Sequence, residues 1–189
     1  MKTNLYLLIL IIAIVGSCKN EPIKTQSQKS AYELVNPFIG TGGHGHTFPG
    51  AIVPFGMVQL SPDTRLTGWD GCSGYHDTDS IIYGFSHTHL SGTGISDYGD
   101  ILLMPFNHSE KISLEEIKNQ QLIPSEFSKE TESATPGFYK VRLDKPEVNV
   151  ELTATTRVGI HKYTFNKEKD NKLLLDLNHR DKVLSSEIN

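Results

Sequence analysis

The segment GFYKVRLDKPEVNVELTATTRVGIHKYTF, residues 137–165, decides the fold class of this chain. Apolar and polar side chains alternate along much of it, and four apolar residues of one parity follow each other: Val148, Val150, Leu152 and Ala154. Side chains alternate between the two faces of a strand, so these four share one face. We expect that face to be buried against a second layer of the protein.

Further short apolar runs extend this pattern along the chain. Six strands are predicted, over residues 52–60, 100–106, 137–143, 148–155, 158–165 and 172–177. In the fifth strand the parity of the apolar residues changes, which predicts a bulge near His161 and Lys162 or a looser register there. A capping-box pattern at residues 113–116 predicts one short helix that continues to residue 121. Closely spaced strands with so little helix predict a mainly β protein, an antiparallel β-sandwich.

Residues 1–17 have the pattern of a secretion signal. A lysine precedes an apolar run that is shorter than the ~20 residues of a membrane-spanning helix. The run ends in Val-Gly-Ser before Cys18, as in a bacterial lipobox, so Cys18 is predicted to carry a lipid that anchors the protein to a membrane. An ordinary signal peptide with an incidental cysteine is the alternative. Residues 18–32 are polar and are expected to form a flexible tether.

The composition excludes some classes of partner. The chain has 189 residues, a formal net charge of −4 and interspersed acidic and basic residues, so no basic face points to nucleic acid. Only two cysteines occur, and if Cys18 carries a lipid, Cys72 has no partner for an intrachain disulfide. Stability is therefore expected to come from the packed core of one domain.

Residues 68–100, GWDGCSGYHDTDSIIYGFSHTHLSGTGISDYGD, combine the only tryptophan with many polar side chains on a glycine-rich backbone. Glycine allows short loops to direct side chains at one point, so this segment is predicted to be a binding surface, with a solvated turn region as the alternative. The indole of Trp69 has a flat apolar face and one N–H donor, which match a pyranose ring. A tryptophan packed in the core is the alternative for this residue.

Two other motifs indicate less specific chemistry. The His-x-His pairs, His44/His46 and His87/His89, would each present two imidazoles on one face of a strand, but no further metal ligand follows at a recognisable spacing. Hydrogen bonds to loop backbone or to sugar hydroxyls are favoured instead. Residues 40–45 satisfy G-x-G-x-x-G, yet prolines on both sides prevent the strand and helix of a dinucleotide site, so a glycine-rich loop is expected there.

Several long segments resemble, in the same order, the N-terminal domain of glycoside hydrolase family 92, the calcium-dependent α-mannosidases. They are VNPFIGTGGHGHTFPGAIVPFGMVQLSPDT (35–64), GFSHTHLSGTG (84–94), GDILLMP (99–105), TPGFYKV (135–141) and ELTATTRVGIHKYTF (151–165). The resemblance implies that residues 33–189 form part of a β-sandwich that is incomplete at its C-terminal end. In the family this domain packs against a C-terminal (α/α) barrel, so the chain is expected to be truncated before the catalytic domain.

The resemblance also implies a function. The complete enzyme is expected to be an exo-acting, inverting α-mannosidase of mannose-containing glycans, with its general acid, general base and Ca²⁺ ligands in the barrel. No catalytic and no metal residue is therefore assigned here, and the chain alone is expected to be inactive. Loops of this domain help to build the mannose pocket in the family, and the matching positions here are Trp69, Asp70, Cys72, Ser73, Gly74, Tyr75, His76, His87 and His89.

The partners and the location of the chain follow from the same expectations. The barrel is present either in cis or as a separate chain, and the lipid anchor places the protein in the bacterial cell envelope, in the periplasm or on the outer-membrane surface. One alternative is a stand-alone carbohydrate-binding lipoprotein, which would bind sugar without the barrel. Another is a non-catalytic partner that completes a split enzyme, which would show activity only on mixing.

Overall fold

The computed structural model describes residues 29–107, 113, 115–116, 123–166, 170–180 and 182–187. The predicted signal sequence, Cys18 and residues 18–28 of the predicted tether lie outside the described residues. Within the described part of the chain, no helix has the length and the apolar character needed to cross a membrane.

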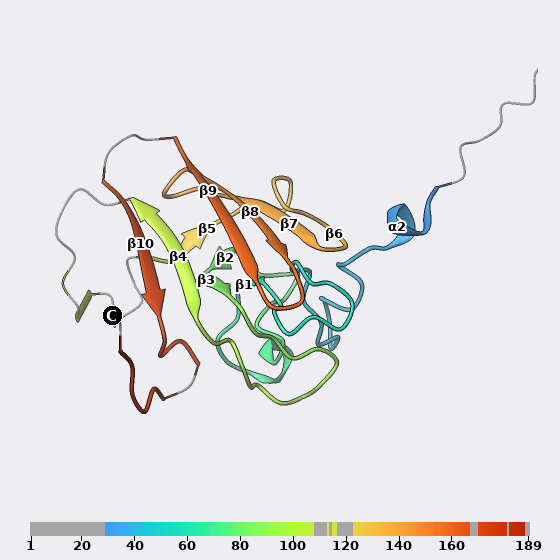
Figure 1. Cartoon of the computed structure of the whole chain (residues 1–189), viewed down its shortest axis with the longest axis horizontal. Coiled ribbons are helices and arrows are strands. Elements are labelled where there is room, and N and C mark those ends of the chain that lie inside the picture. The colour runs from blue at the N-terminus through green and yellow to red at the C-terminus, as the bar shows by residue number, and fades with distance from the viewer. Residues whose placement is uncertain are drawn as a thin grey trace, which may run out of the picture.

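Two four-stranded antiparallel sheets dominate the structure (Figure 1). The first has the order β1-β3-β4-β10 and contains β1 (Ser61–Asp63), β3 (Gly84–Ser86), β4 (Leu102–Asn107) and β10 (Asn171–Asp176). The second has the order β6-β7-β8-β9 and contains β6 (Ser133–Thr135), β7 (Phe138–Leu143), β8 (Val148–Ala154) and β9 (Gly159–Phe165). A small pair, β2 (Ile81–Ile82) and β5 (Ser125–Glu126), completes the strands of the described residues. The predicted mainly β, antiparallel architecture is confirmed.

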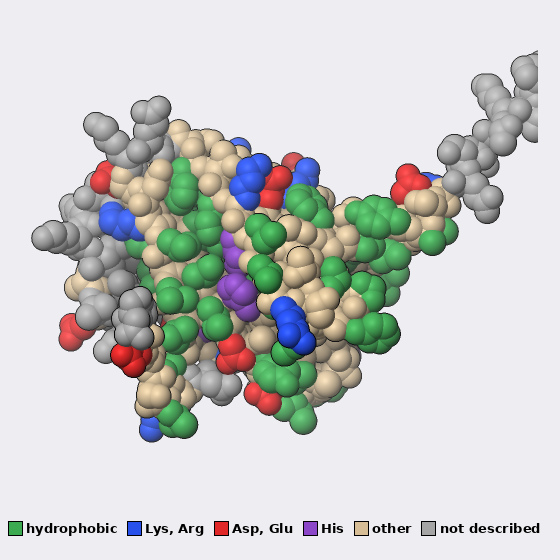
Figure 2. Space-filling model, viewed as in Figure 1, with side chains coloured by type: hydrophobic (Ala, Val, Ile, Leu, Met, Phe, Trp, Pro, Cys, Tyr) green, Lys and Arg blue, Asp and Glu red, His purple; other side chains and the backbone are tan. Residues whose placement is uncertain are grey.

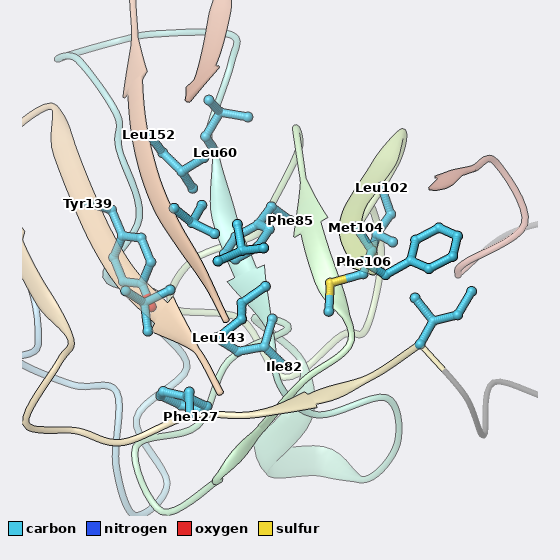
Figure 3. Close-up of a cluster of buried hydrophobic side chains, with 14 of the residues drawn as sticks. Leu60, Ile82, Phe85, Leu102, Met104, Phe106, Phe127, Tyr139, Leu143 and Leu152 are labelled. Atoms are coloured by element: carbon cyan, nitrogen blue, oxygen red, sulfur yellow. The ribbon is translucent and has the colours of Figure 1, made fainter. Parts of the chain in front are cut away.

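The hydrophobic core joins side chains from both sheets (Figure 3). All four residues that the alternation of residues 148–154 places on one face are buried, as predicted. Phe85 of β3 and Met104 of β4 belong to the same cluster and are fully buried. Because apolar side chains of two sheets share one core, the fold is sandwich-like.

Five of the six predicted strands are confirmed with small changes of their bounds: they are β4, β7, β8, β9 and β10. The strand predicted over residues 52–60 is wrong. Pro54 and Phe55 form a turn there, in which the Gly56 N–H donates to the Val53 carbonyl at 2.9 Å and Phe55 has a φ of 60°. Proline at the second position favours such a turn, and Phe55 is fully exposed. Only the bridge between Ala51 and Leu60 remains of the expected pairing.

The bulge predicted near His161 and Lys162 is also wrong. Strands β8 and β9 pair without interruption, from Val148 with Phe165 to Ala154 with Gly159. The change of parity arises because His161 occupies an inward position in β9, while Ile160 points outward and is 50% exposed. A polar residue on the inner face therefore imitates the sequence signature of a bulge.

Two capping boxes mark helix starts. The Ser113 N–H donates to the Glu116 carboxylate at 2.7 Å and the Glu116 N–H donates to the Ser113 hydroxyl at 3.2 Å, as predicted, whereas the rest of that predicted helix lies outside the described residues. The short helix α2 (Ala31–Leu34) begins with a second capping box, between Ser30 and Glu33. Helix α2 occupies the predicted boundary between tether and domain.

Candidate functional site

Trp69 is 58% exposed, so the alternative of a tryptophan packed in the core is wrong. It begins a single 3₁₀ turn, Trp69–Gly71, that follows Gly68. The indole faces a loop from the other side: a β-carbon on Gly94 would lie 2.5 Å from the Trp69 Nε1 atom. Only glycine allows the backbone to approach the indole this closely, and this approach holds one edge of the ring against the loop.

Two imidazoles and one carboxylate surround the indole. The His46 ring meets it edge-on with 4.4 Å between the ring centroids, and the His44 ring is tilted at 5.5 Å. The His44 Nδ1 atom donates to the Asp70 Oδ1 atom at 2.9 Å. Trp69, Asp70, His44 and His46 thus form one group, which we call the Trp69 cluster.

The Trp69 cluster has an unused hydrogen-bonding atom. His46 is buried, and its Nε2 atom has no hydrogen-bond partner among the described residues. This nitrogen lies 3.8 Å from the Asp70 Oδ1 atom, which is too far for a direct hydrogen bond. The hydrogen bond from His44, aided by the other nearby imidazoles, lowers the pKa of the Asp70 carboxyl group below its usual range. An ionised acceptor, an imidazole and an apolar face therefore lie together, as a polyhydroxylated ring requires.

Five other predicted binding residues follow Asp70 in the sequence, and they support the Trp69 cluster from the interior of the protein. Cys72, Ser73, Gly74, Tyr75 and His76 are all buried. The Ser73 hydroxyl donates to the Thr47 carbonyl at 3.0 Å, and the His76 Nε2 atom donates to the Gly43 carbonyl at 3.0 Å. These bonds join the segment to the glycine-rich loop that carries His44 and His46. As predicted for that loop, no helix follows it in residues 46–60. In this structure the five residues support the site and expose little surface to it.

Tyr75 anchors the same segment to the second sheet. Its hydroxyl donates to the buried carboxylate of Glu132, 3.0 Å from each oxygen, and accepts from the Lys129 Nζ atom at 2.6 Å. The Tyr139 hydroxyl donates to the same carboxylate at 2.7 Å. Burial, together with the negative charge of Glu132, raises the pKa of Tyr75 far above its usual value, so its phenol stays neutral. This hydrogen-bond network holds the segment that supports the Trp69 cluster in place against the second sheet.

The second His-x-His pair does not act as a unit. The His89 ring is buried on the first sheet, where its Nδ1 atom donates to the Gln59 carbonyl at 2.8 Å and its Nε2 atom lies 3.6 Å from the Asp63 carboxylate. The His87 ring points elsewhere and its Nδ1 atom donates to the Ile101 carbonyl at 2.6 Å. The expectation that both imidazoles share one face is therefore wrong for this pair, while the predicted hydrogen bonds to loop backbone are present.

His87 lies in an open hollow of about 640 Å³ between the two sheets. The hollow is lined by Met57, Val58, His87, Thr88, Ile101, Arg157 and Gly159. Figure 2 shows histidine side chains at the centre of this face, between β4 and β9, with hydrophobic side chains around them. This hollow is separate from the group of side chains around Trp69.

A chain of hydrogen bonds begins at His87 in this hollow and continues to β9. The His87 Nδ1 atom carries a proton because it donates to a carbonyl, so its Nε2 atom accepts from the His161 Nε2 atom at 3.1 Å. The His161 Nδ1 atom then accepts from the Tyr163 hydroxyl at 2.8 Å. Burial and the neighbouring His87 lower the pKa of His161 to about 4, so this imidazole is neutral at pH 7. These hydrogen bonds link β9 of the second sheet to the loop after β3.

The described residues do not provide a metal centre. In the part of the chain that the structure describes, no group of three or more His, Cys, Asp or Glu side chains could hold a metal ion. Ca²⁺ takes about six to eight oxygen ligands, and the Trp69 cluster contributes a single carboxylate. The cluster therefore does not fit the Ca²⁺ ion that the sequence resemblance implies.

His44 and His46 are the residues of the site that the sequence-based set of binding residues lacks. Their motif is visible in the sequence, but it is compatible with a metal site, with loop hydrogen bonds and with sugar hydroxyls. The signal that could have selected them is their position in a glycine-rich loop, as for Trp69. Whether any of the predicted residues contacts a sugar stays a prediction.

Known proteins provide an independent comparison. The model of the glycosyl hydrolase family 92 N-terminal domain matches residues 34–189. A structure of a family GH92 α-mannosidase from Bacteroides thetaiotaomicron in complex with mannoimidazole is 40% identical, with a TM-score of 0.70, and the match covers 77% of this chain and 19% of that chain. An inverting family GH92 mannosidase from the same bacterium is 32% identical, with a TM-score of 0.63, over 79% of this chain and 20% of its own.

A curated protein from Arthroderma benhamiae gives a similar result. It is described as an uncharacterized secreted glycosidase and is 28% identical over 171 residues, which cover 82% of this chain and 21% of that protein. The chain spans about a fifth of the length of these relatives.

Proposed function

Because the chain belongs to glycosyl hydrolase family 92, whose N-terminal domain matches residues 34–189, we propose that it supplies one wall of the sugar pocket of an exo-acting, inverting α-mannosidase. Its substrate is a mannose-containing glycan. The observation that carries this proposal is the Trp69 cluster, an exposed indole surrounded by a carboxylate and two imidazoles.

Each part of the Trp69 cluster has a definite use in sugar binding. The indole face packs on the C–H face of a pyranose, which removes apolar surface from water on both partners. Asp70 is partly exposed and accepts from one sugar hydroxyl. The Nε2 atom of His46 is buried 3.8 Å from the Asp70 carboxylate, and the His46 ring supports the indole from behind through its edge-on contact. Aromatic stacking with charged hydrogen bonds at its edge gives both affinity and orientation.

The catalytic steps belong to another part of the enzyme. Inverting glycosidases need a general acid and a general base about 6.5–9.5 Å apart, with a water molecule between them. We assign neither role to a residue of this chain and expect both carboxyl groups, together with the Ca²⁺ ligands, in a C-terminal barrel. The contribution of this chain is to bind and orient the terminal mannose.

We further propose that the protein is exported and anchored by a lipid on Cys18. The apolar run that ends in Val-Gly-Ser-Cys supports this location, and the secreted relative from Arthroderma benhamiae supports export. Labelling of the bacterium with a radioactive fatty acid should mark the wild-type protein and leave Cys18→Ala unmarked. Equal labelling of both would refute the anchor.

The test of the pocket uses the enzyme that contains this chain together with its catalytic part. Trp69→Ala should lower kcat/KM on an α-mannoside by about threefold to tenfold, since an aromatic contact contributes ~0.5–1.5 kcal/mol beyond its buried area. Trp69→Phe is the matched control and should retain part of the contact. An unchanged kcat/KM in Trp69→Ala would remove Trp69 from the sugar pocket.

The chain without the barrel should turn over no α-mannoside, with or without Ca²⁺. Sugar binding by this chain alone would favour the alternative of a carbohydrate-binding lipoprotein. Activity that appears on mixing with a separate barrel chain would favour the split enzyme.

A further inference from the structure

Arg180 follows β10 in the sequence, yet its side chain reaches the loops around Trp69. The side chain is 9% exposed. Its Nη1 atom donates to the Ser96 hydroxyl at 2.6 Å, and its Nη2 atom donates to the Arg65 carbonyl at 2.7 Å and reaches the Gly71 carbonyl at 3.5 Å. One guanidinium group therefore joins three short segments, two of them within residues 65–71 and one at Ser96, to the segment after β10.

Two of these segments hold the indole. Gly71 is the last residue of the 3₁₀ turn that begins with Trp69. Ser96 belongs to the loop that includes Gly94, whose backbone lies against the Trp69 Nε1 atom. Arg180 bonds to Ser96 on the loop side and to the Arg65 carbonyl on the side of the turn, and it also lies near the Gly71 carbonyl, so it links the two segments between which the indole edge lies.

The position of Arg180 is itself constrained. Its Nη2 atom lies 3.7 Å from the Asp63 Oδ1 atom, and Asp63 is fully buried. A buried carboxylate requires a compensating charge, so this ion pair keeps the guanidinium in place. Gly99 adds a steric constraint, since a β-carbon there would lie 2.5 Å from the Arg180 Cγ atom. The planar fork of arginine can bond several acceptors at once, which the single ammonium group of lysine cannot.

We propose that Arg180 is a positioning residue for the Trp69 cluster: it fixes the spacing between the Trp69–Gly71 turn and the Gly94–Ser96 loop, and so the orientation in which the indole meets a sugar. The guanidinium does not touch the sugar. Its role in recognition rests on the proposed function, because the orientation of Trp69 matters to binding only if Trp69 contacts the glycan.

The test uses the fact that Trp69 is the only tryptophan of the chain, so its fluorescence reports on this site alone. Arg180→Lys and Arg180→Gln in the whole chain should shift the emission maximum and increase quenching by acrylamide, in the absence of any sugar. In the enzyme that contains this chain together with its catalytic part, the affinity for mannobiose should fall on the order of tenfold, the effect of losing one or two hydrogen bonds. Arg142→Lys, on the exposed face of β7, is the matched control and should change neither signal.

A general loss of stability is separated from positioning by a urea titration of each variant. The proposal predicts altered Trp69 fluorescence in variants that still unfold cooperatively. If an Arg180 variant does not fold, Ser96→Ala removes one bond of the guanidinium and leaves the Asp63 ion pair, and it should still increase quenching. Unchanged fluorescence in folded Arg180 variants, or in Ser96→Ala if they do not fold, would overturn the proposal.

The two proposals fail in different ways. If the wild-type chain binds no mannobiose with or without the catalytic part, while Arg180 variants still alter Trp69 fluorescence, the proposed function is wrong and the positioning role stands. If mannobiose binds but Arg180 variants leave both fluorescence and affinity unchanged, the positioning role is wrong and the proposed function stands.

Discussion

The two His-x-His pairs have the same sequence spacing and opposite structural roles. His44 and His46 lie in a glycine-rich loop, and both rings contact the exposed indole of Trp69. His87 and His89 follow a strand, and their rings separate into the hollow between the sheets and the buried surroundings of Asp63. The spacing of two histidines therefore does not define a site, because the backbone that carries them decides which groups they meet.

The two pairs differ in the hydrogen-bond partners of their ring nitrogens. His87 and His89 use both ring nitrogens within the chain, so their imidazoles hold strands and loops together. In the loop pair, His44 is bonded to Asp70 and the Nε2 atom of His46 has no partner among the described residues. The strand pair therefore stabilises the fold, whereas the loop pair lies against the exposed indole, and of its two rings His44 is the one that solvent reaches.

The largest effect is expected when the buried member of the strand pair is removed. His89→Ala should lower the free energy of unfolding by about 3–5 kcal/mol, because it leaves a cavity where a buried ring lay and removes one of several partners of the buried Asp63 carboxylate. His44→Ala is the matched control, since the His44 side chain is 79% exposed. Urea titrations of both variants measure the difference, and equal losses of stability would contradict the separation of roles.

The second test concerns His161, the hydrogen-bond partner of His87, and measures how stability depends on pH. The pKa of His161 is lowered to about 4, so between pH 6.5 and 4 the unfolded chain binds a proton at this residue that the folded chain does not. Stability should therefore decrease as the pH falls through that window, by about 3 kcal/mol at most. Urea midpoints at several pH values measure this slope.

His161→Gln provides the control for this test. Glutamine does not titrate, so the variant should lose the slope between pH 6.5 and 4 and keep any slope that arises from carboxyl groups at lower pH. A slope of unchanged size in the variant would assign the effect to another group.

A smaller effect is expected at the loop pair, and it concerns binding. His46→Gln should weaken mannobiose binding by about 0.5–1.5 kcal/mol, the value of an aromatic pair, because it removes the edge-on contact of the His46 ring with the Trp69 indole. Calorimetric titration measures the affinity, and His87→Gln is the comparison variant with the opposite pattern. A loss of affinity in His87→Gln and none in His46→Gln would reverse the assignment of the two pairs.

The smallest effect is expected for the surface bond between His44 and Asp70. His44→Gln should leave the free energy of unfolding nearly unchanged, since both groups are at the surface. It should raise the pKa of the Asp70 carboxyl group toward its usual value, because the His44 bond is the main cause of its decrease. Carbon-detected NMR titration measures this pKa, and an unchanged value would show that the bond does not form in solution.

The sequence predicts the second sheet well because each of its strands pairs with the next one along the chain. The alternation that places Val148 and Leu152 on a buried face is a local property, and the structure confirms it. The failures occur where a local pattern has a second explanation. Phe55 belongs to an apolar run that becomes an exposed turn, and the outward position of Ile160 imitates a bulge.

The candidate site is only partly visible in the sequence for a related reason. The exposure of Trp69 agrees with the glycine residues on either side of it. The contact between His44 and Asp70 joins residues 26 positions apart, so only the folded chain shows that they belong together. Burial of Cys72 and Tyr75 was equally hidden, because their neighbours in the sequence are polar.

The pairing of β4 with β10 has a consequence for the order in which the chain folds. Leu102 pairs with Asp176 and Asn107 with Asn171, so one edge of β4 pairs with β3, while the other edge must wait for a partner that is synthesised after all four strands of the second sheet. Hairpins between neighbouring strands close quickly, while distant strands pay a larger entropy of loop closure and pair slowly. We therefore expect the second sheet to form early during synthesis, and the surroundings of Trp69, which depend on Arg180, to become ordered last.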